Sequence, residues 1–143
     1  MNEKFYGIII DTNQYAGNFE RELCAHLTGH YDEYEVGIEL AELVPDNIKE
    51  LFNNVITRPD ESNCWRPVEI RQNGNGEYNS LIIYFDTLPT QEHIDTIYER
   101  INSYKDAVLE TSGFYKEFPD LIKVPVINDV YIVEVFKSIY NRI

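Results

Sequence analysis

The sequence predicts an α+β fold, a ferredoxin-like βαββαβ-type sheet with helices packed on one face, formed by residues 1–143 as a single domain. The length of 143 residues is the usual size of one domain. Segments of strand and helix character follow one another in the order strand, helix, strand, hairpin, helix, strand, which is the order of that fold. In addition, residues 6–12 and 81–87 resemble each other, because each is an apolar strand that ends in Asp-Thr and precedes a helix.

The first strand and the two helices after it are predicted from hydrophobic spacing. Residues 5–10 are apolar and β-branched toward their end, as in a buried strand. One helix is expected to follow Asn18 and to end at Gly29, and another amphipathic helix is expected after Pro45. Residues 30–42 fit either a short strand or an ordered loop. The apolar positions of the two helices are Phe19, Leu23 and Leu27, then Ile48, Leu51, Phe52 and Val55.

A β-hairpin is predicted in the middle of the chain. Residues 67–72 alternate between apolar and polar, with Val68 and Ile70 on one face. The stretch Asn73-Gly74-Asn75-Gly76 is a strong turn signal, because Asn and Gly accept positive φ angles at low cost. The returning strand is expected over residues 78–85.

A helix and a C-terminal β segment complete the predicted fold. Thr90 is a suitable N-cap, and Glu92 in the first turn is favoured by the helix dipole. Residues 123–140 are rich in Val, Ile, Tyr and Phe and predict one or two strands, with a turn at Asn128-Asp129. The buried stripe of the helix is expected to be Ile94, Ile97, Tyr98, Ile101 and Val108.

The composition predicts an acidic cytoplasmic protein without a membrane anchor. Acidic residues outnumber basic ones 25 to 12, and the net charge of −13 argues against direct DNA binding. The charge serves either solubility or mimicry of DNA. No apolar run approaches a membrane span, and the N-terminus lacks the layout of a signal peptide. The two cysteines, Cys24 and Cys64, are expected to be reduced.

Candidate metal and catalytic residues are few. Asp11 and Asp86 end the two similar strands, and in the expected fold they would lie side by side, either binding a divalent cation or capping turns. The spacing of Cys24, His26 and His30 matches no standard zinc signature, and Cys24 is expected in the core. His93 is expected to be an exposed surface residue. Since no catalytic or phosphate-loop motif is present, the sequence favours a protein that is not an enzyme and needs no cofactor.

Two regions suggest a ligand site for a small anion. Arginine binds phosphate and tryptophan stacks on bases, so the loop 57–67 with its Arg-Trp-Arg content is one candidate. The polar start of the first helix, 13–22, is the other, because helix N-termini attract anions. The alternatives are that the tryptophan fills the core while the arginines pair with nearby carboxylates, and that the helix start is a solvated turn. The candidate ligand-binding residues are Tyr15, Asn18, Arg21, Arg58, Trp65 and Arg66.

Several segments resemble a family of small proteins found in tailed-phage genomes. They are Asn18-Phe19-Glu20-Arg21-Glu22-Leu23-Cys24, Arg58-Pro59-Asp60-Glu61 with Cys64, Arg66 and Pro67, and Pro89-Thr90-Gln91-Glu92. The group is similar to the first Thoeris anti-defence family. The resemblance implies an oligomeric sponge that sequesters cyclic ADP-ribose isomers or cyclic oligonucleotides, without cleaving them, in the infected host cell.

Three other functions stay open beside this one, and the first is a helper of phage nucleotide metabolism or replication. An acidic DNA mimic would bind a host defence nuclease directly, and its partner would be that host defence protein. A metal-dependent phosphodiesterase would use Asp11 and Asp86. The sponge predicts a small anionic nucleotide as ligand, a homo-oligomer, and no membrane partner.

Overall fold

The computed structural model describes residues 4–29, 35–56, 68–137 and 139–143. These residues form an α+β fold with a five-stranded sheet. The strands lie in the order β2-β3-β1-β4-β5, and every neighbouring pair is antiparallel. The strands are β1 (Lys4–Thr12), β2 (Val68–Arg71), β3 (Ser80–Phe85), β4 (Ile127–Phe136) and β5 (Ile139–Arg142).

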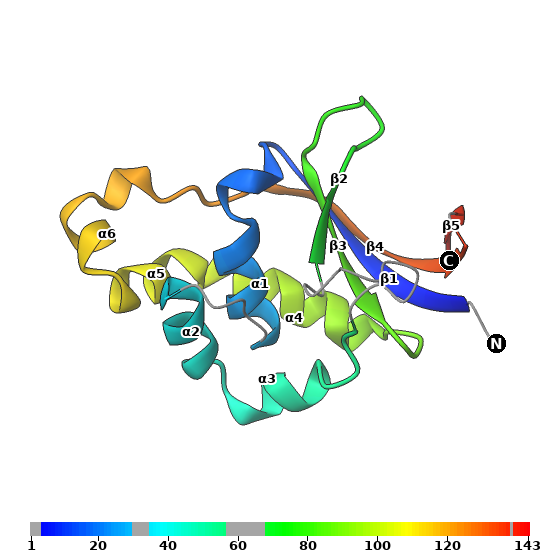
Figure 1. Cartoon of the computed structure of the whole chain (residues 1–143), viewed down its shortest axis with the longest axis horizontal. Coiled ribbons are helices and arrows are strands. Elements are labelled where there is room, and N and C mark those ends of the chain that lie inside the picture. Colours follow the sequence, from blue (N-terminus) through cyan, green and yellow to red (C-terminus); the bar gives the residue numbers. More distant parts are fainter. Residues whose placement is uncertain (1–3, 30–34, 57–67, 138) are drawn as a thin grey trace.

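Six α-helices in the described residues gather on one side of the sheet (Figure 1). Three lie between β1 and β2 in the sequence, and three lie between β3 and β4. Figure 1 shows α6 far from the strand ends at which β5 lies. None of these helices is long and apolar enough to cross a membrane. They are α1 (Glu20–Thr28), α2 (Glu35–Glu42), α3 (Asp46–Leu51), α4 (Gln91–Asn102), α5 (Tyr104–Thr111) and α6 (Gly113–Glu117), with 3-10 turns at Ala16–Asn18 and Pro119–Leu121.

The main core lies between the helices and the side of the sheet that we call the helix face. Side chains alternate along a strand, so Ile8 and Ile10 of β1 point to this face together with Ile83 of β3. The predicted helix stripe Phe19, Leu23 and Leu27 packs against them, and all three are almost fully buried. Cys24 is buried in the same core, as predicted.

A second apolar cluster covers the opposite side of the sheet, which we call the outer face. Gly7 belongs to this face, and a Cβ there would lie 2.7 Å from Cδ1 of Ile82. The glycine therefore lets the Ile82 side chain cross the β1 backbone. The buried residues of the outer face are Phe5, Ile9, Ile82, Tyr84, Val133 and Val135.

Several local predictions are confirmed. Gly29 ends α1 with a φ of 76°, the left-handed conformation that glycine tolerates best. The Asn73 side chain accepts hydrogen bonds from the backbone N–H groups of Asn75 and Glu77, which shapes the turn between β2 and β3. In contrast, residues 35–42 form the helix α2, where the sequence had suggested either a short strand or an ordered loop.

The helix predicted after Thr90 differs from expectation in two ways. It is broken at Ser103 into α4 and α5, so Val108 belongs to the second of these helices. Tyr98 is 42% exposed and does not belong to the buried stripe. Ile97 and Ile101 are buried as predicted.

The predicted turn at Asn128-Asp129 is wrong. Both residues belong to β4, which pairs with β1 continuously from Phe136 to Asp129 and then shifts register at Asn128, so that Ile127 lies opposite Thr12. The chain turns later, near Lys137, which has a φ of 57°. Asn and Asp favour turns, but here the long pairing with the central strand β1 overrides that local preference.

Candidate functional site

The sheet curls toward its outer face, so side chains from its two edge strands come into contact. Arg71 lies on the edge strand β2, and Tyr140 lies on the opposite edge strand β5. At about 4.8 Å per strand, a flat sheet would separate these edges by about 19 Å. The guanidinium carbon of Arg71 nevertheless lies 3.8 Å from the centre of the Tyr140 ring. The outer face is therefore concave.

A pocket of about 290 Å³ lies in this concavity. Its apolar residues are Ile9 and Val133, and its remaining residues carry polar groups. Both edges of the sheet contribute, because β2 supplies Arg71 and β5 supplies Tyr140 and Arg142. The complete lining is Ile9, Arg71, Gln72, Tyr131, Val133, Tyr140 and Arg142.

Each arginine of the pocket stacks on a tyrosine. Arg71 lies over Tyr140, and the guanidinium carbon of Arg142 lies 4.3 Å from the centre of the Tyr131 ring. Such stacking holds a guanidinium in place while its N–H groups stay available at the edge. The pocket therefore presents two oriented cationic groups beside aromatic and aliphatic surface.

The two arginines differ in their partners. Nη1 of Arg142 donates to Oδ2 of Asp129 at 3.0 Å, an ion pair between exposed side chains. Nη1 of Arg71 is buried and has no hydrogen-bond partner among the described residues. Buried polar atoms in proteins are nearly always paired, so this guanidinium nitrogen has room for an acceptor that the described residues do not supply.

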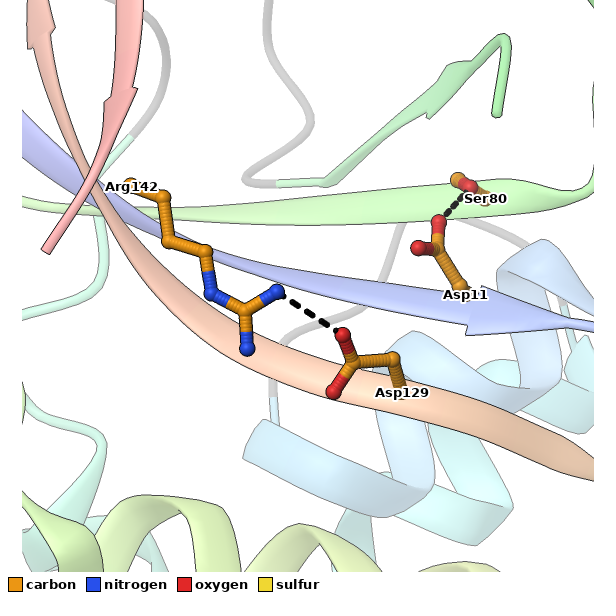
Figure 2. A network of polar contacts seen from close by, with 4 residues as sticks. All are labelled: Asp11, Ser80, Asp129 and Arg142. Atoms are coloured by element: carbon orange, nitrogen blue, oxygen red, sulfur yellow. Dashed lines mark hydrogen bonds and ion pairs between the residues drawn. The ribbon is translucent and has the colours of Figure 1, made fainter. Parts of the chain in front are cut away.

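A row of polar residues crosses the outer face next to the pocket. Strand register aligns Arg71 with Ser80, Ser80 with Asp11, and Asp11 with Asp129. Figure 2 shows the Ser80 hydroxyl bonded to Asp11 and Arg142 reaching Asp129 from β5. Ser80 donates to Oδ1 of Asp11. Two carboxylates thus stand side by side on β1 and β4, and each has one polar partner.

Burial and nearby charged groups raise the pKa values of two tyrosines on the outer face. Burial raises the pKa of Tyr131, and the charge of Asp11 raises it further, while Arg142 and Arg71 oppose the shift. Tyr84, buried beneath Tyr140, has its pKa raised mainly by burial. Both rings therefore remain neutral near pH 7.

A hydrogen-bonded chain fixes the ring of Tyr140. The hydroxyl of Tyr84 donates to Oε2 of Glu69 at 2.9 Å, because a carboxylate can only accept. The hydroxyl of Tyr140, at 3.3 Å from that of Tyr84, must then be the donor of their shared bond. Tyr140 is thus held from two sides, by Arg71 and by Tyr84.

The expected pairing of Asp11 with Asp86 is wrong. β1 and β3 are central neighbours, as predicted, but they run antiparallel, so Asp11 lies opposite Ser80 while Tyr6 lies opposite Phe85. Asp86 follows Phe85 at the far end of the strand pair. The phosphodiesterase alternative loses the metal site on which it was based. In the described part of the chain, no group of three His, Cys, Asp or Glu residues could hold a metal ion.

The ligand-binding residues predicted from the sequence lie elsewhere or outside the described residues. Arg58, Trp65 and Arg66 belong to 57–67, which the structure does not describe. Tyr15 and Asn18 are exposed in the connection between β1 and α1, and Arg21 is exposed in the first turn of α1. None of these three lines the pocket.

Both described histidines are structural. His93 is buried, contrary to the expected surface position. Its Nε2 donates to the carbonyl of Leu51 at 2.9 Å, and its Nδ1 accepts from the backbone N–H of Thr90 at 3.1 Å. Since His93 takes the place that Glu usually holds in a capping box, it joins the start of α4 to the end of α3.

Sequence reasoning missed the pocket because its residues lie on four strands. The available signal was alternation: Tyr131 and Val133 share a face of one segment, as do Tyr140 and Arg142 of the next. That pattern identifies a polar, aromatic face but not its curvature.

Neither a scan of the chain against models of protein families nor searches of curated proteins and of solved structures found a match.

Proposed function

We propose that this protein binds and sequesters a small anionic nucleotide-type ligand without cleaving it. The supporting observation is the outer-face pocket, in which Arg71 and Arg142 stack on tyrosines and one nitrogen of Arg71 lacks an acceptor. Guanidinium groups bind phosphate, and tyrosine rings offer surface on which a base can stack. The described pocket residues include no paired nucleophile and base, so binding is the chemistry that they support.

We further propose that the biological role is counter-defence, as the resemblance to the phage anti-defence proteins implies. The ligand would then be a host cyclic nucleotide signal, held as a homo-oligomer in the cytoplasm of the infected cell. The residues Tyr15, Asn18, Arg21, Arg58, Trp65 and Arg66 stay candidates for a second contact region. A direct inhibitor of a host nuclease is the competing hypothesis.

The fold that we propose for the core is the ferredoxin-like one. Its support is the strand order β2-β3-β1-β4, with antiparallel neighbours and helical segments between β1 and β2 and between β3 and β4. In this view β5 is an addition to the edge. The addition matters for function, because β5 supplies Tyr140 and Arg142 to the pocket.

The experiment that tests the proposed function is capture of the ligand from cells. Purified protein is incubated with lysate from cells that run a nucleotide-signalling defence, washed and denatured, and the released small molecules are identified by mass spectrometry. We expect an intact nucleotide, and the double variant Arg71→Gln/Arg142→Gln should release none. Release of a cleaved product would indicate an enzyme, and release of nothing from folded protein would favour direct protein binding.

A further inference from the structure

The charges around the pocket restrict the ligand that it can accept. Two guanidinium groups, Arg71 and Arg142, lie on the outer face at the pocket. Three carboxylates share this face with them: Asp11 and Asp129 in the row beside the pocket, and Glu69 two positions before Arg71 on β2. Among the described residues of this face the carboxylates outnumber the cations, so these residues do not form the strongly positive field that a polyphosphate needs.

Only one of the two cations lacks a carboxylate partner in the described structure. Arg142 is paired with Asp129, whereas Nη1 of Arg71 has no acceptor. Arg71 belongs to the lining of the pocket, so this unpaired nitrogen belongs to a side chain that a bound ligand would contact. At Arg71, therefore, the negative charge of a ligand can pair with a guanidinium group without displacing a carboxylate of the described residues.

The size of the pocket also favours a small ligand with few charges. A volume of about 290 Å³ is at the lower end of the range for small-molecule sites, which is about 300–1,000 Å³. It suits one nucleoside unit with its phosphate group. Ile9 and Val133 supply apolar surface, and Tyr131 supplies a ring.

Resting on the proposed function, we propose that the pocket recognises a single nucleoside unit that carries one negative charge, as in a phosphodiester, with Arg71 as its anion-binding residue. Nucleotides with a terminal phosphate monoester carry about two or more charges near pH 7.5 and are disfavoured, because the second pKa of a phosphate monoester is about 6. The extra charge would face the carboxylates of Asp11, Glu69 and Asp129. Arg142 serves to hold Tyr131 and Asp129 in place.

The test compares ligands that differ in phosphate charge. Calorimetry at pH 7.5, without divalent cations, measures the Kd of 3′,5′-cyclic AMP, AMP and ATP. We expect cyclic AMP to bind about tenfold more tightly than AMP, and ATP to bind more weakly still, since one unfavourable charge contact near a protein surface amounts to at least this factor. At about pH 5, where AMP carries close to one charge, its Kd should approach that of cyclic AMP.

Variants of Arg71 provide the second arm. Arg71→Gln should weaken cyclic AMP binding by about thirtyfold or more, as expected when a desolvated charged hydrogen bond is lost. Lys105→Gln, which removes the same charge from the exposed side of α5, is the matched control and should bind as the wild type does. If Arg71→Gln does not fold, Arg71→Lys decides, because it keeps the charge but lacks the planar fork.

The outcomes separate the two proposals. Equal or tighter binding of AMP and ATP, or undiminished binding by Arg71→Gln or Arg71→Lys, overturns this inference and leaves the capture experiment to judge the proposed function. Capture of an intact nucleotide from lysate together with no binding of cyclic AMP also overturns the inference alone. No capture and no binding of any of the three nucleotides overturns both.

Discussion

Arg71 and Tyr140 lie on opposite edge strands of the sheet and yet contact each other, with the guanidinium carbon 3.8 Å from the ring centre. This contact joins segments 69 positions apart in the chain and is the clearest sign that the sheet is curled. Tyr140 also shares a hydrogen bond with Tyr84, whose strand β3 lies next to the central strand β1. The concave outer face, and with it the pocket, depends on how firmly β5 is held there.

Tyr140 is therefore the residue whose loss should loosen β5. Tyr140→Ala removes the ring from Arg71 and Tyr84, and we expect the free energy of unfolding to fall by about 1–3 kcal/mol, as for truncation of a half-buried aromatic residue. Tyr140→Phe keeps the ring and loses the hydroxyl bond to Tyr84, so it should cost about 1 kcal/mol. Urea unfolding measures both values.

Hydrogen exchange locates the effect of the Tyr140 variants. In Tyr140→Ala the amide of Ile143, which donates to the carbonyl of Ile132 at 3.0 Å, should exchange much faster than in Tyr140→Phe. Amides of β1 should keep their protection in both variants. Unchanged exchange at Ile143 in Tyr140→Ala would mean that β5 is held by other contacts and that the curl does not depend on this ring.

Gly7 should be intolerant of a side chain. A Cβ at this position would lie 2.7 Å from Cδ1 of Ile82 and 3.3 Å from the backbone oxygen of Ile83. Ile82 is completely buried, so Gly7→Ala should destabilise the protein by about 1–3 kcal/mol, as overpacking of a core does. Thermal or urea unfolding measures the change.

The matched control for Gly7 lies in the hairpin turn. A Cβ on Gly74 would meet nothing within 4 Å, so Gly74→Ala should leave stability unchanged or raise it slightly by restricting the unfolded chain. Gly76 is unsuitable as a control because its φ is 79°. Equal stability of Gly7→Ala and Gly74→Ala would show that the outer face adapts more easily than its packing indicates.

Asp129 should matter for the ligand far more than for stability. Its ion pair with Arg142 joins side chains that are 43% and 60% exposed, and it also faces Asp11 across the strands. The attraction and the repulsion largely offset each other, so Asp129→Asn should change the free energy of unfolding by less than about 0.5 kcal/mol. In contrast, removal of this carboxylate should narrow the difference in Kd between AMP and cyclic AMP severalfold.

An exposed aspartate far from the pocket controls for the change in net charge. Asp120 is suitable because it is exposed in the 3-10 turn that follows α6, a helix that lies far from β5 (Figure 1). Asp120→Asn should leave the ratio of the two Kd values unchanged. If Asp120→Asn and Asp129→Asn alter the ratio equally, overall charge and not the carboxylate beside the pocket governs selectivity.

Periodicity was sufficient to predict the main core but not the site. The spacing of Phe19, Leu23 and Leu27 predicted a buried helix face, and the apolar run of β1 predicted a central strand, because both signals are local. The curl is not local, since it requires Tyr140 to meet Arg71 across the whole sheet. The same long-range pairing of β4 with β1 overrode the turn preference of Asn128-Asp129.

Histidine burial gives a last prediction, on pH dependence. His26 is 2% exposed, and its partners assign its tautomer. Nε2 lies 2.7 Å from the carbonyl oxygen of Arg100 and must donate, whereas Nδ1 accepts from Nη2 of Arg100 at 3.0 Å. Burial, reinforced by the positive charge of Arg100, lowers the pKa of His26 from 6.5 to about 4. The folded protein therefore holds this ring neutral.

Because the pKa of His26 is lower in the folded than in the unfolded chain, its contribution is fully present above pH 6.5 and is lost as the pH falls toward 4. Between pH 7.5 and 5 the free energy of unfolding should drop by about 2 kcal/mol on this account. His26→Gln should be less stable than the wild type at pH 7.5, and its free energy of unfolding should lack this drop between pH 7.5 and 5. His93→Gln should still show the drop that His26 causes. Urea titrations at several pH values measure the slopes. Equal slopes for the wild type and His26→Gln would show that the pKa of this ring is the same in the folded and the unfolded chain, and the assigned pairing with Arg100 would then be wrong.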